Sequence, residues 1–221
     1  KKGLGYLLVT DHSQGLGIAG GLLPEDLVRQ CAEIRVLDRA FGGDFRLLCG
    51  TEVEVRSDGS LDFPDELLSK MDIVVAAVHS ALSGDREKVT GRFLSAIRHP
   101  LVHVLAHPTG RLLAGKGRSG ADADWDRVFS EAAANGTALE INASPMRLDL
   151  PDTLARRALE LGCVFAVSTD AHAPEQFGYA RFGVAVAKRA WIPPERVVNT
   201  WEPDRLLEWA RGKPARVAAL G

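Results

Sequence analysis

The stretch Val164-Phe165-Ala166-Val167-Ser168-Thr169-Asp170-Ala171-His172 indicates both the fold and the place of its chemistry. Its apolar first half, rich in β-branched residues, is typical of a buried strand. The strand ends in a carboxylate and an imidazole two residues apart, Asp170 and His172. Alternate residues of an extended chain point the same way, so both groups can reach one small volume. Taken alone, a helix cap and a surface histidine explain the pair equally well.

Similar apolar runs recur along the chain, and a helix-like segment follows nearly all of them. The other runs are Tyr6–Thr10, Arg46–Gly50, Ile73–Val78, Val102–Ala106 and Ala138–Ile141. Helices are expected at Pro24–Arg39, Pro64–Ser69, Asp85–Ile97, Asp124–Asn135, Leu150–Leu161, Phe177–Ala190 and Pro203–Arg211. This alternation predicts a parallel sheet with right-handed crossovers, either a barrel or a doubly wound sheet. The residues from Gly212 onward are expected to fray.

Length and composition suit one α/β domain covering residues 1–221. Hydrophobic residues make up 46% of the chain and the formal net charge is −2, so no global basic field favours a long nucleic-acid footprint, although a local one stays open. We expect no signal peptide, and no apolar run approaches the ~20 residues that cross a membrane, so a cytoplasmic location is expected. Cys31, Cys49 and Cys163 lie far apart in apolar runs and are predicted to be buried free thiols.

The polar residues that follow the strands converge if the sheet is a barrel, because all carboxyl-terminal strand ends then open on one face. Imidazole nitrogen suits zinc, iron and manganese, and carboxylate oxygen suits manganese and magnesium and can bridge two ions. A helix cap, a buried core histidine or a surface group explains each polar residue at a strand end when it is taken alone. Together, these residues predict a metal site. The predicted ligands are His12, Glu52, His79, His107, Asp170 and His172.

Six protein ligands exceed the three that one hydrolytic zinc needs, which predicts a centre with more than one metal. Two metals about 3.5–4 Å apart serve phosphoester hydrolysis, because they activate a bridging water and stabilise the attacking and leaving oxygens. Amide hydrolysis on two metals uses similar ligands, so the bond that is cleaved stays open. His99 and His103 lie away from the strand tips and are expected to be structural.

Basic residues follow His107 on a glycine-rich segment, at Arg111, Lys116 and Arg118. They are predicted to hold substrate phosphate or the backbone of single-stranded DNA. A solvated loop is the alternative explanation, above all for Lys116 and Arg118. The four tryptophans lie in or beside helices and are expected to pack rather than to stack on bases: Trp125, Trp191, Trp201 and Trp209.

Several stretches resemble successive motifs of the polymerase-and-histidinol-phosphatase (PHP) superfamily. They are Thr10-Asp11-His12-Ser13, Gly50-Thr51-Glu52-Val53, Val78-His79-Ser80, Leu105-Ala106-His107-Pro108 and Ser168-Thr169-Asp170-Ala171-His172. Further segments are similar to the C-terminal PHP domain of bacterial family X DNA polymerases in particular: residues 62–65, 109–113, 139–143, 145–150 and 189–192.

The resemblance implies a distorted (β/α)7 TIM-like barrel that holds two to three divalent ions, zinc or manganese. In the polymerase branch it implies a manganese-stimulated 3′–5′ exonuclease that acts on single-stranded DNA or 3′ ends in repair. Glu52, Asp170 and His107 would be catalytic. Glu52 would bridge two ions, the second also held by His79 and His107 and the first by Asp170, while His12 and His172 would hold a third. Asp11 would orient a ligand.

One departure from the family matters. The family begins with a strand ending in His-x-His, and no such pair occurs in these 221 residues. We therefore expect a fragment whose barrel lacks its first β/α unit, with exposed edges on its first and last strands. Its first metal site is expected to be weak or empty and its hydrolysis poor; a decayed domain is the alternative. DNA is the expected partner, through an attached polymerase region. A histidinol-phosphate-type small-molecule phosphatase and a non-catalytic, metal-braced module are the competing functions, and the oligomeric state is left open.

Overall fold

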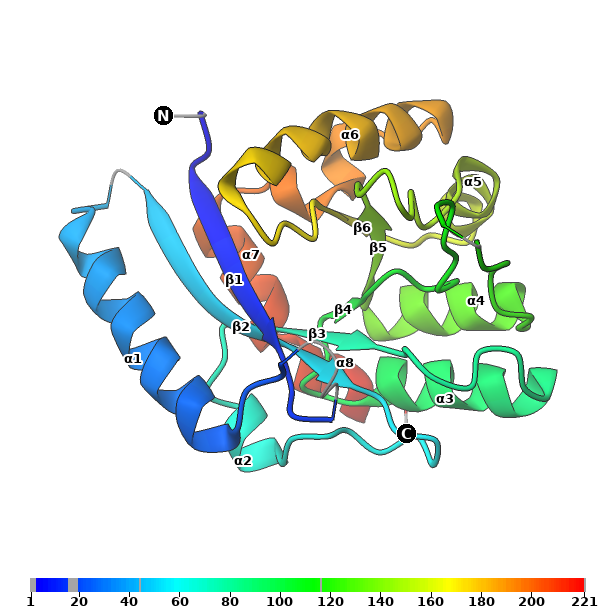
Figure 1. The fold of residues 1–221 in the computed structure, drawn as a ribbon, viewed down its shortest axis with the longest axis horizontal. Helices are drawn as coiled ribbons and strands as arrows, with labels where there is room; N and C mark the ends of the chain where they lie inside the picture. The colour runs from blue at the N-terminus through cyan, green and yellow to red at the C-terminus, as the bar shows by residue number, and fades with distance from the viewer. Residues whose placement is uncertain (1–2, 16–19, 44, 116, 221) are drawn as a thin grey trace.

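The strands of the chain form a single parallel sheet. The computed structural model describes residues 3–15, 20–43, 45–115 and 117–220. The strand order is β1-β2-β3-β4-β5-β6, with β1 at Tyr6–His12, β2 at Arg46–Glu54, β3 at Ile73–Ala77, β4 at Val104–Leu105, β5 at Ala138–Asn142 and β6 at Phe165–Ser168. The sheet curls into a half-barrel that is compatible with part of a TIM-like barrel (Figure 1). The predicted α/β class is confirmed, and the sevenfold barrel stays a prediction.

Helices join successive strands along most of the chain. They are α1 (Pro24–Ala40), α2 (Asp65–Leu68), α3 (Arg86–Arg98), α4 (Trp125–Asn135), α5 (Asp152–Glu160), α6 (Ala180–Arg189), α7 (Pro203–Arg211) and α8 (Lys213–Ala218), with short 3-10 turns at Pro174–Tyr179, Pro194–Arg196 and Val198–Thr200. Gly136 ends α4 in the left-handed region (φ 67°), as its position after the predicted helix indicates. In the described part of the chain, no helix has the length and apolar character required to cross a membrane.

Apolar side chains cover both faces of the sheet, because alternate strand residues point to opposite sides. On one face Cys49, Val74 and Leu105 pack in a cluster with residues of α1, α3, α4 and α5. On the other face the neighbouring residues Leu48, Val75 and Val104 pack with Trp201 and with Leu206, Leu207 and Ala210 of α7. Helix α7 therefore covers the inner face of the half-barrel, and the carboxyl ends of the strands are left to polar side chains.

The predicted exposed edge is wrong for β6. Val197 forms a parallel bridge with Phe165 of this strand. The side chain of Asn199 accepts a hydrogen bond from the Val167 amide at 2.7 Å and donates one to the Val167 carbonyl at 3.0 Å. The segment after α6 thus satisfies backbone groups that an edge strand would expose. Among the described strands β1 pairs with β2 alone, so its free edge agrees with the prediction.

The residues after Gly212 form a helix rather than a frayed end. Helix α8 begins at Lys213, whose side chain is fully buried. Its ammonium group donates to the carbonyl of Ile97 at 3.0 Å, to the carbonyl of Val102, and to Thr137 Oγ1 at 2.6 Å. These acceptors lie far away in sequence, so no local pattern predicts that they anchor the helix.

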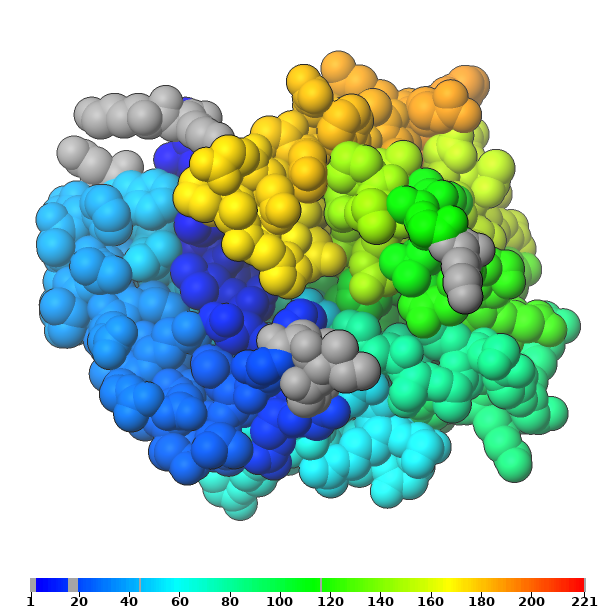
Figure 2. All heavy atoms as spheres, in the orientation of Figure 1, coloured from blue at the N-terminus to red at the C-terminus, as the bar shows by residue number. Residues whose placement is uncertain are grey.

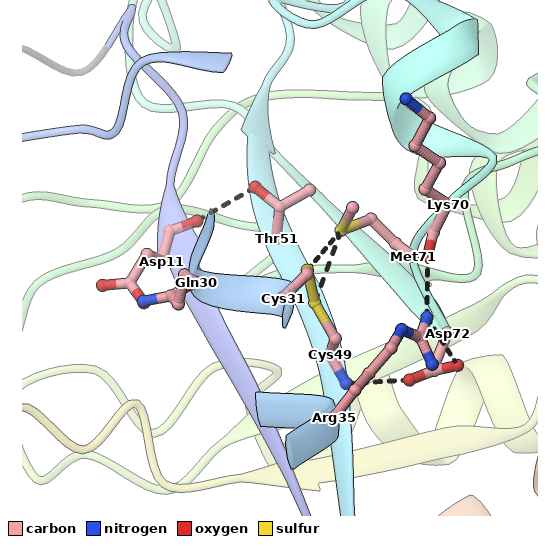
Figure 3. The surroundings of a disulfide bond; sticks show 9 residues. All are labelled: Asp11, Gln30, Cys31, Arg35, Cys49, Thr51, Lys70, Met71 and Asp72. Atoms are coloured by element: carbon pink, nitrogen blue, oxygen red, sulfur yellow. Dashed lines mark hydrogen bonds and ion pairs between the residues drawn. A yellow bond between two sulfur atoms is a disulfide. The ribbon is translucent and has the colours of Figure 1, made fainter. Parts of the chain in front are cut away.

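The free-thiol prediction is wrong for Cys31 and Cys49, which form a disulfide between α1 and β2 (Figure 3). The cause is tertiary: Cys49 points to the face of β2 that α1 covers, and the two Cα atoms lie 5.5 Å apart, a separation that a disulfide spans. The Met71 sulfur lies 3.5 Å from Cys31 Sγ and 3.8 Å from Cys49 Sγ. Cys163 is free and buried, as predicted.

The tryptophans agree with the packing prediction except for one. Trp125 packs against Phe93 and Phe129, and Trp201 contacts Trp209 edge to face. Trp191, however, is 73% exposed, and it follows the last turn of α6 with a positive φ of 60°. Its indole instead contacts the guanidinium of Arg156, 4.5 Å from the ring centroid.

The disulfide can be tested by counting thiols in the denatured protein. Without reductant we expect one reactive thiol, Cys163, and after reduction we expect three, because the chain has three cysteines. Ellman titration in guanidinium measures both numbers. In the native protein Cys163 should stay unreactive, since burial raises the pKa of its thiol to about 12. Three thiols before reduction would show that Cys31 and Cys49 only lie in contact.

The anchoring of α8 predicts a stability loss on Lys213→Met. The substitution leaves the carbonyls of Ile97 and Val102 and the Thr137 hydroxyl without their buried donor, so we expect the free energy of unfolding to fall by about 3 kcal/mol. Urea unfolding measures the change. Lys188→Met, at an exposed position of α6, is the matched control and should change stability by less than about 0.5 kcal/mol.

Candidate metal centre

One carboxylate oxygen lies at the centre of the polar cluster. Because β1 and β2 pair in register, His12 stands directly beside Glu52. Glu52 Oε1 lies 3.6 Å from His12 Nδ1, 3.3 Å from His79 Nε2 and 3.2 Å from His107 Nε2. The ligand atoms of His12, Glu52 and His79 all lie within 4.8 Å of one another, so one metal ion can contact all three.

The electrostatics of the cluster favour an ionised Glu52. Burial alone would raise the pKa of this carboxyl group, but hydrogen bonds from His107 and His79 bring it well below its usual range. Burial likewise opposes the charged form of His79, yet its hydrogen bonds with Glu52 and Glu54 raise its pKa to about 9. Glu52 therefore carries a negative charge, and the imidazoles of His79 and His107 both form hydrogen bonds with it.

The donor set fits a divalent cation. His12 Nδ1 and His107 Nδ1 are buried and have no hydrogen-bond partner within the described part of the chain, although His12 Nδ1 faces Glu52 at 3.6 Å. Buried polar atoms are costly when they stay unpaired, and imidazole nitrogen beside carboxylate oxygen is a preferred environment for zinc and manganese. His12, Glu52 and His79 would hold such an ion, with His107 against the same carboxylate oxygen.

Glu54, which the sequence analysis did not single out, orients one of these imidazoles. Its Oε2 lies 2.5 Å from His79 Nδ1, and its Oε1 accepts a hydrogen bond from the His79 amide at 3.3 Å. His79 Nε2 is consequently turned toward Glu52. A carboxylate behind a ligating histidine fixes its tautomer and its orientation. The signal was present in the sequence, because Glu52 and Glu54 are two residues apart and share one face of β2.

His107 enters the cluster from an unusual backbone conformation. Its φ is +24°, and its amide donates to the Glu140 carboxylate, which is buried beneath it. Burial raises the pKa of Glu140 to about 7. Residues held at positive φ without being glycine are strained, and such strain persists where the surroundings impose it. The Glu140 contact is one of those constraints, because it fixes the turn that carries His107 toward Glu52.

Asp170 and His172 form a second group at the same end of the sheet. Asp170 has a φ of +51°, and its Oδ2 accepts a hydrogen bond from Asn142 Nδ2 at 3.1 Å. The His172 ring is 65% exposed, and its centroid lies 6.2 Å from that of His12. The structure thus places His172 beside His12, whereas Asp170 faces Asn142. How the six predicted ligands divide among ions stays a prediction.

Asp11 does not orient a metal ligand as expected. Neighbouring strand residues point to opposite faces, so Asp11 points away from His12 and toward α1. There its Oδ2 accepts a hydrogen bond from Gln30 at 2.6 Å, beside the disulfide (Figure 3).

His99 and His103 are structural, as predicted. His103 Nδ1 accepts from the Val74 amide, and His99 lies 3.2 Å from Asp65.

Two of the three predicted phosphate-binding residues, Arg111 and Arg118, have backbone partners. Arg111 donates to the carbonyls of Arg147 and Leu148, and Arg118 donates to the carbonyl of Gly110. Lys116 lies outside the described residues, and phosphate binding by all three stays a prediction. Arg147 also brings a guanidinium group to the site, since its Nε lies 3.7 Å from Asp170 Oδ2. Arg147 follows β5 after a loop, so strand-end reasoning missed it.

Curated proteins of two kinds are similar to the chain, although no protein-family model matches it. It is 40% identical over 199 residues to the DNA polymerase/3′-5′ exonuclease PolX of Bacillus subtilis (strain 168), in an alignment that covers 90% of this chain and 34% of that protein. It is 29% identical over 227 residues to a probable phosphatase of Thermoanaerobacter sp. (strain X514), covering 98% of this chain and 86% of the phosphatase. A probable phosphatase of Syntrophotalea carbinolica is 26% identical over 208 residues. The chain thus spans about a third of the polymerase.

The role of Glu54 predicts a loss of metal affinity in Glu54→Gln. The amide accepts more weakly from His79 Nδ1 and releases the imidazole from its orientation, so we expect Zn²⁺ or Mn²⁺ to bind about 10–100-fold more weakly. Isothermal titration measures the affinity. Glu66→Gln removes the same charge at an exposed position of α2 and should leave the affinity unchanged. Equal affinities for Glu54→Gln and the native protein would contradict the role of Glu54.

Proposed function

Since the comparisons confirm the resemblance to the PHP superfamily, we propose that this chain is a metal-dependent phosphoesterase. The observation that carries the proposal is the position of Glu52 Oε1 among three imidazole nitrogens at the carboxyl ends of parallel strands. The names of the similar proteins, an exonuclease and probable phosphatases, point to the same class of bond.

The residues of the cluster suit this chemistry. A bound divalent cation supplies a Lewis acid and lowers the pKa of a water molecule. Glu52 is ionised at neutral pH, because its hydrogen-bonded histidines lower the pKa of its carboxyl group, and it would hold the cation together with His12 and His79. Asp170 and His172 lie 3.7 Å apart at the same end of the sheet and would complete the site. Glu54 and Glu140 hold His79 and His107 in place.

The more specific part of the proposal is a 3′–5′ exonuclease that acts on single-stranded DNA or 3′ ends, with manganese or zinc. The 40% identity to the Bacillus subtilis DNA polymerase/3′-5′ exonuclease supports it. Within this proposal the partner is DNA, presented by an attached polymerase region, the role is in repair and the location is the cytoplasm. Glu52, His107 and Asp170 are the residues on which catalysis would depend most.

A small-molecule phosphatase of the histidinol-phosphate type is the second candidate. The alignment with the probable phosphatase of Thermoanaerobacter, which covers 86% of that protein, favours it. A non-catalytic module is the third candidate, since a metal that joins β1, β2 and the end of β3 would also brace the fold. Both alternatives are outcomes of the following test.

In the full-length protein, with the attached polymerase region, we expect release of mononucleotides from single-stranded DNA when Mn²⁺ is present. His107→Ala and Asp170→Ala should each lower the rate by about 100-fold or more, because they remove groups predicted to hold the metals. Quantifying the labelled mononucleotides released from an oligonucleotide that carries its label in the 3′-terminal nucleotides measures the rate. The matched controls are His99→Ala, at a histidine that pairs with Asp65, and Asp122→Ala, at an exposed aspartate. Both variants should keep full activity.

The other outcomes separate the alternatives. Hydrolysis of histidinol phosphate without release of nucleotides would identify the small-molecule phosphatase. A melting temperature that rises with Mn²⁺ while no phosphoester is turned over would identify the non-catalytic module. Full nucleotide release by both His107→Ala and Asp170→Ala would sink the proposed site.

A further inference from the structure

Arg147 presents unused hydrogen-bonding capacity next to the metal site. Its side chain is 17% exposed, and its Nε lies 3.7 Å from Asp170 Oδ2. Its Nη1 is buried and has no hydrogen-bond partner among the described residues. A buried guanidinium nitrogen without an acceptor is costly, and the acceptors that guanidinium groups match best are carboxylate and phosphate oxygens.

The backbone of Arg147 is held by Arg111. Arg111 Nε donates to the Arg147 carbonyl at 2.9 Å, and its Nη2 donates to the Leu148 carbonyl. The Arg147 amide in turn donates to the Ser144 carbonyl at 2.9 Å. Arg111 is therefore engaged in fixing this loop, and Arg147 supplies the positive charge that contacts a site carboxylate.

Two apolar side chains lie exposed on the same pair of loops. The Leu113 amide donates to the Met146 carbonyl at 2.7 Å, which joins the loop after β4 to the loop that carries Arg147. Leu113 is 53% exposed and Met146 is 51% exposed. A flat, apolar ring that covers both would remove this surface from water, and methionine adapts well to aromatic partners.

We propose that these loops form a nucleotide subsite, in which Arg147 holds a phosphate group and Leu113 and Met146 support the attached base. The inference rests on the proposed phosphoesterase function and specifies its substrate class. A site for a small phosphate monoester needs the guanidinium but not the apolar pair, whereas a nucleotide uses both. Arg111 is then a positioning residue, which acts on phosphate through Arg147.

Binding of two product-like probes tests the subsite without requiring turnover. The probes are thymidine 5′-monophosphate and 2-deoxyribose 5-phosphate, which share the phosphate and differ by the base, and the protein is loaded with Mn²⁺. Arg147→Gln should weaken both probes about tenfold or more, because a charged hydrogen bond is lost. The double variant Leu113→Ser with Met146→Ser should weaken only the nucleotide, by about 3–10-fold. Isothermal titration measures the dissociation constants.

Controls separate this effect from damage to the fold or the metal site. Arg127→Gln, at an exposed ion pair between α3 and α4, should bind both probes as the native protein does. Mn²⁺ affinity of Arg147→Gln should not fall. For Arg111→Gln we expect weaker binding of both probes, and the double variant with Arg147→Gln should bind no more weakly than Arg147→Gln alone.

Two results would overturn the subsite. If Arg147→Gln binds both probes with the affinity of the native protein, Arg147 does not contact the phosphate. If the double serine variant loses the same affinity for both probes, Leu113 and Met146 do not contact the base. These results are independent of catalysis. A protein that binds the probes as expected but hydrolyses no phosphoester would refute the proposed function while the subsite stands.

Discussion

The carboxylate of Glu52 is the group on which the arrangement of the site depends. Three imidazole nitrogens from three different strand ends lie 3.2–3.6 Å from one of its oxygens. That geometry requires the register in which His12 of β1 pairs with Glu52 of β2. It also requires close approach of the strands, because a side chain on Gly50 would meet the Ile73 carbonyl oxygen at 2.5 Å. A slip of one residue would turn Glu52 to the face covered by α1.

Around this carboxylate, buried polar side chains fix the loops that an apolar core alone would leave free. Arg92 is 6% exposed and donates to the carbonyls of Val55, Arg56 and Ser80, which ties α3 to the ends of β2 and β3. Glu140 and Asn142 do the same for the turns that carry His107 and Asp170. Lys213 performs a comparable role at a distance from the site, where it anchors α8. Each of these side chains joins segments that are remote in sequence, so tertiary contacts hold the loops of the site in place.

Periodicity predicted the strands and most helices well, since apolar runs and helical spacing are local properties of the chain. Helix α7 begins and ends at Pro203 and Arg211, as its sequence pattern indicates. The errors for the cysteines, for the residues after Gly212 and for the edge of β6 share one cause, which is a partner far away along the chain. Cys49 meets Cys31 because α1 covers one face of β2, Lys213 meets Ile97 and Thr137, and β6 is covered by Asn199. The strand-end rule found His12, Glu52, His79 and His107, but it passed over Arg147, which lies in a loop.

The sequence by itself determined the α/β class and the parallel sheet, because strand-like and helix-like segments alternate along the chain. It also determined the residue types at the strand tips, because the period of two along a strand assigns each side chain to a face. For a barrel, this pattern predicts imidazoles and carboxylates together at one end of the sheet. Only the tertiary structure decided which of them share an oxygen, that Glu54 orients His79, and that Asp11 points to Gln30 instead. It also decided that Arg111 holds a loop while Arg147 faces Asp170. Distances across a sheet depend on register, curl and loop conformation, and contacts between remote segments impose all three.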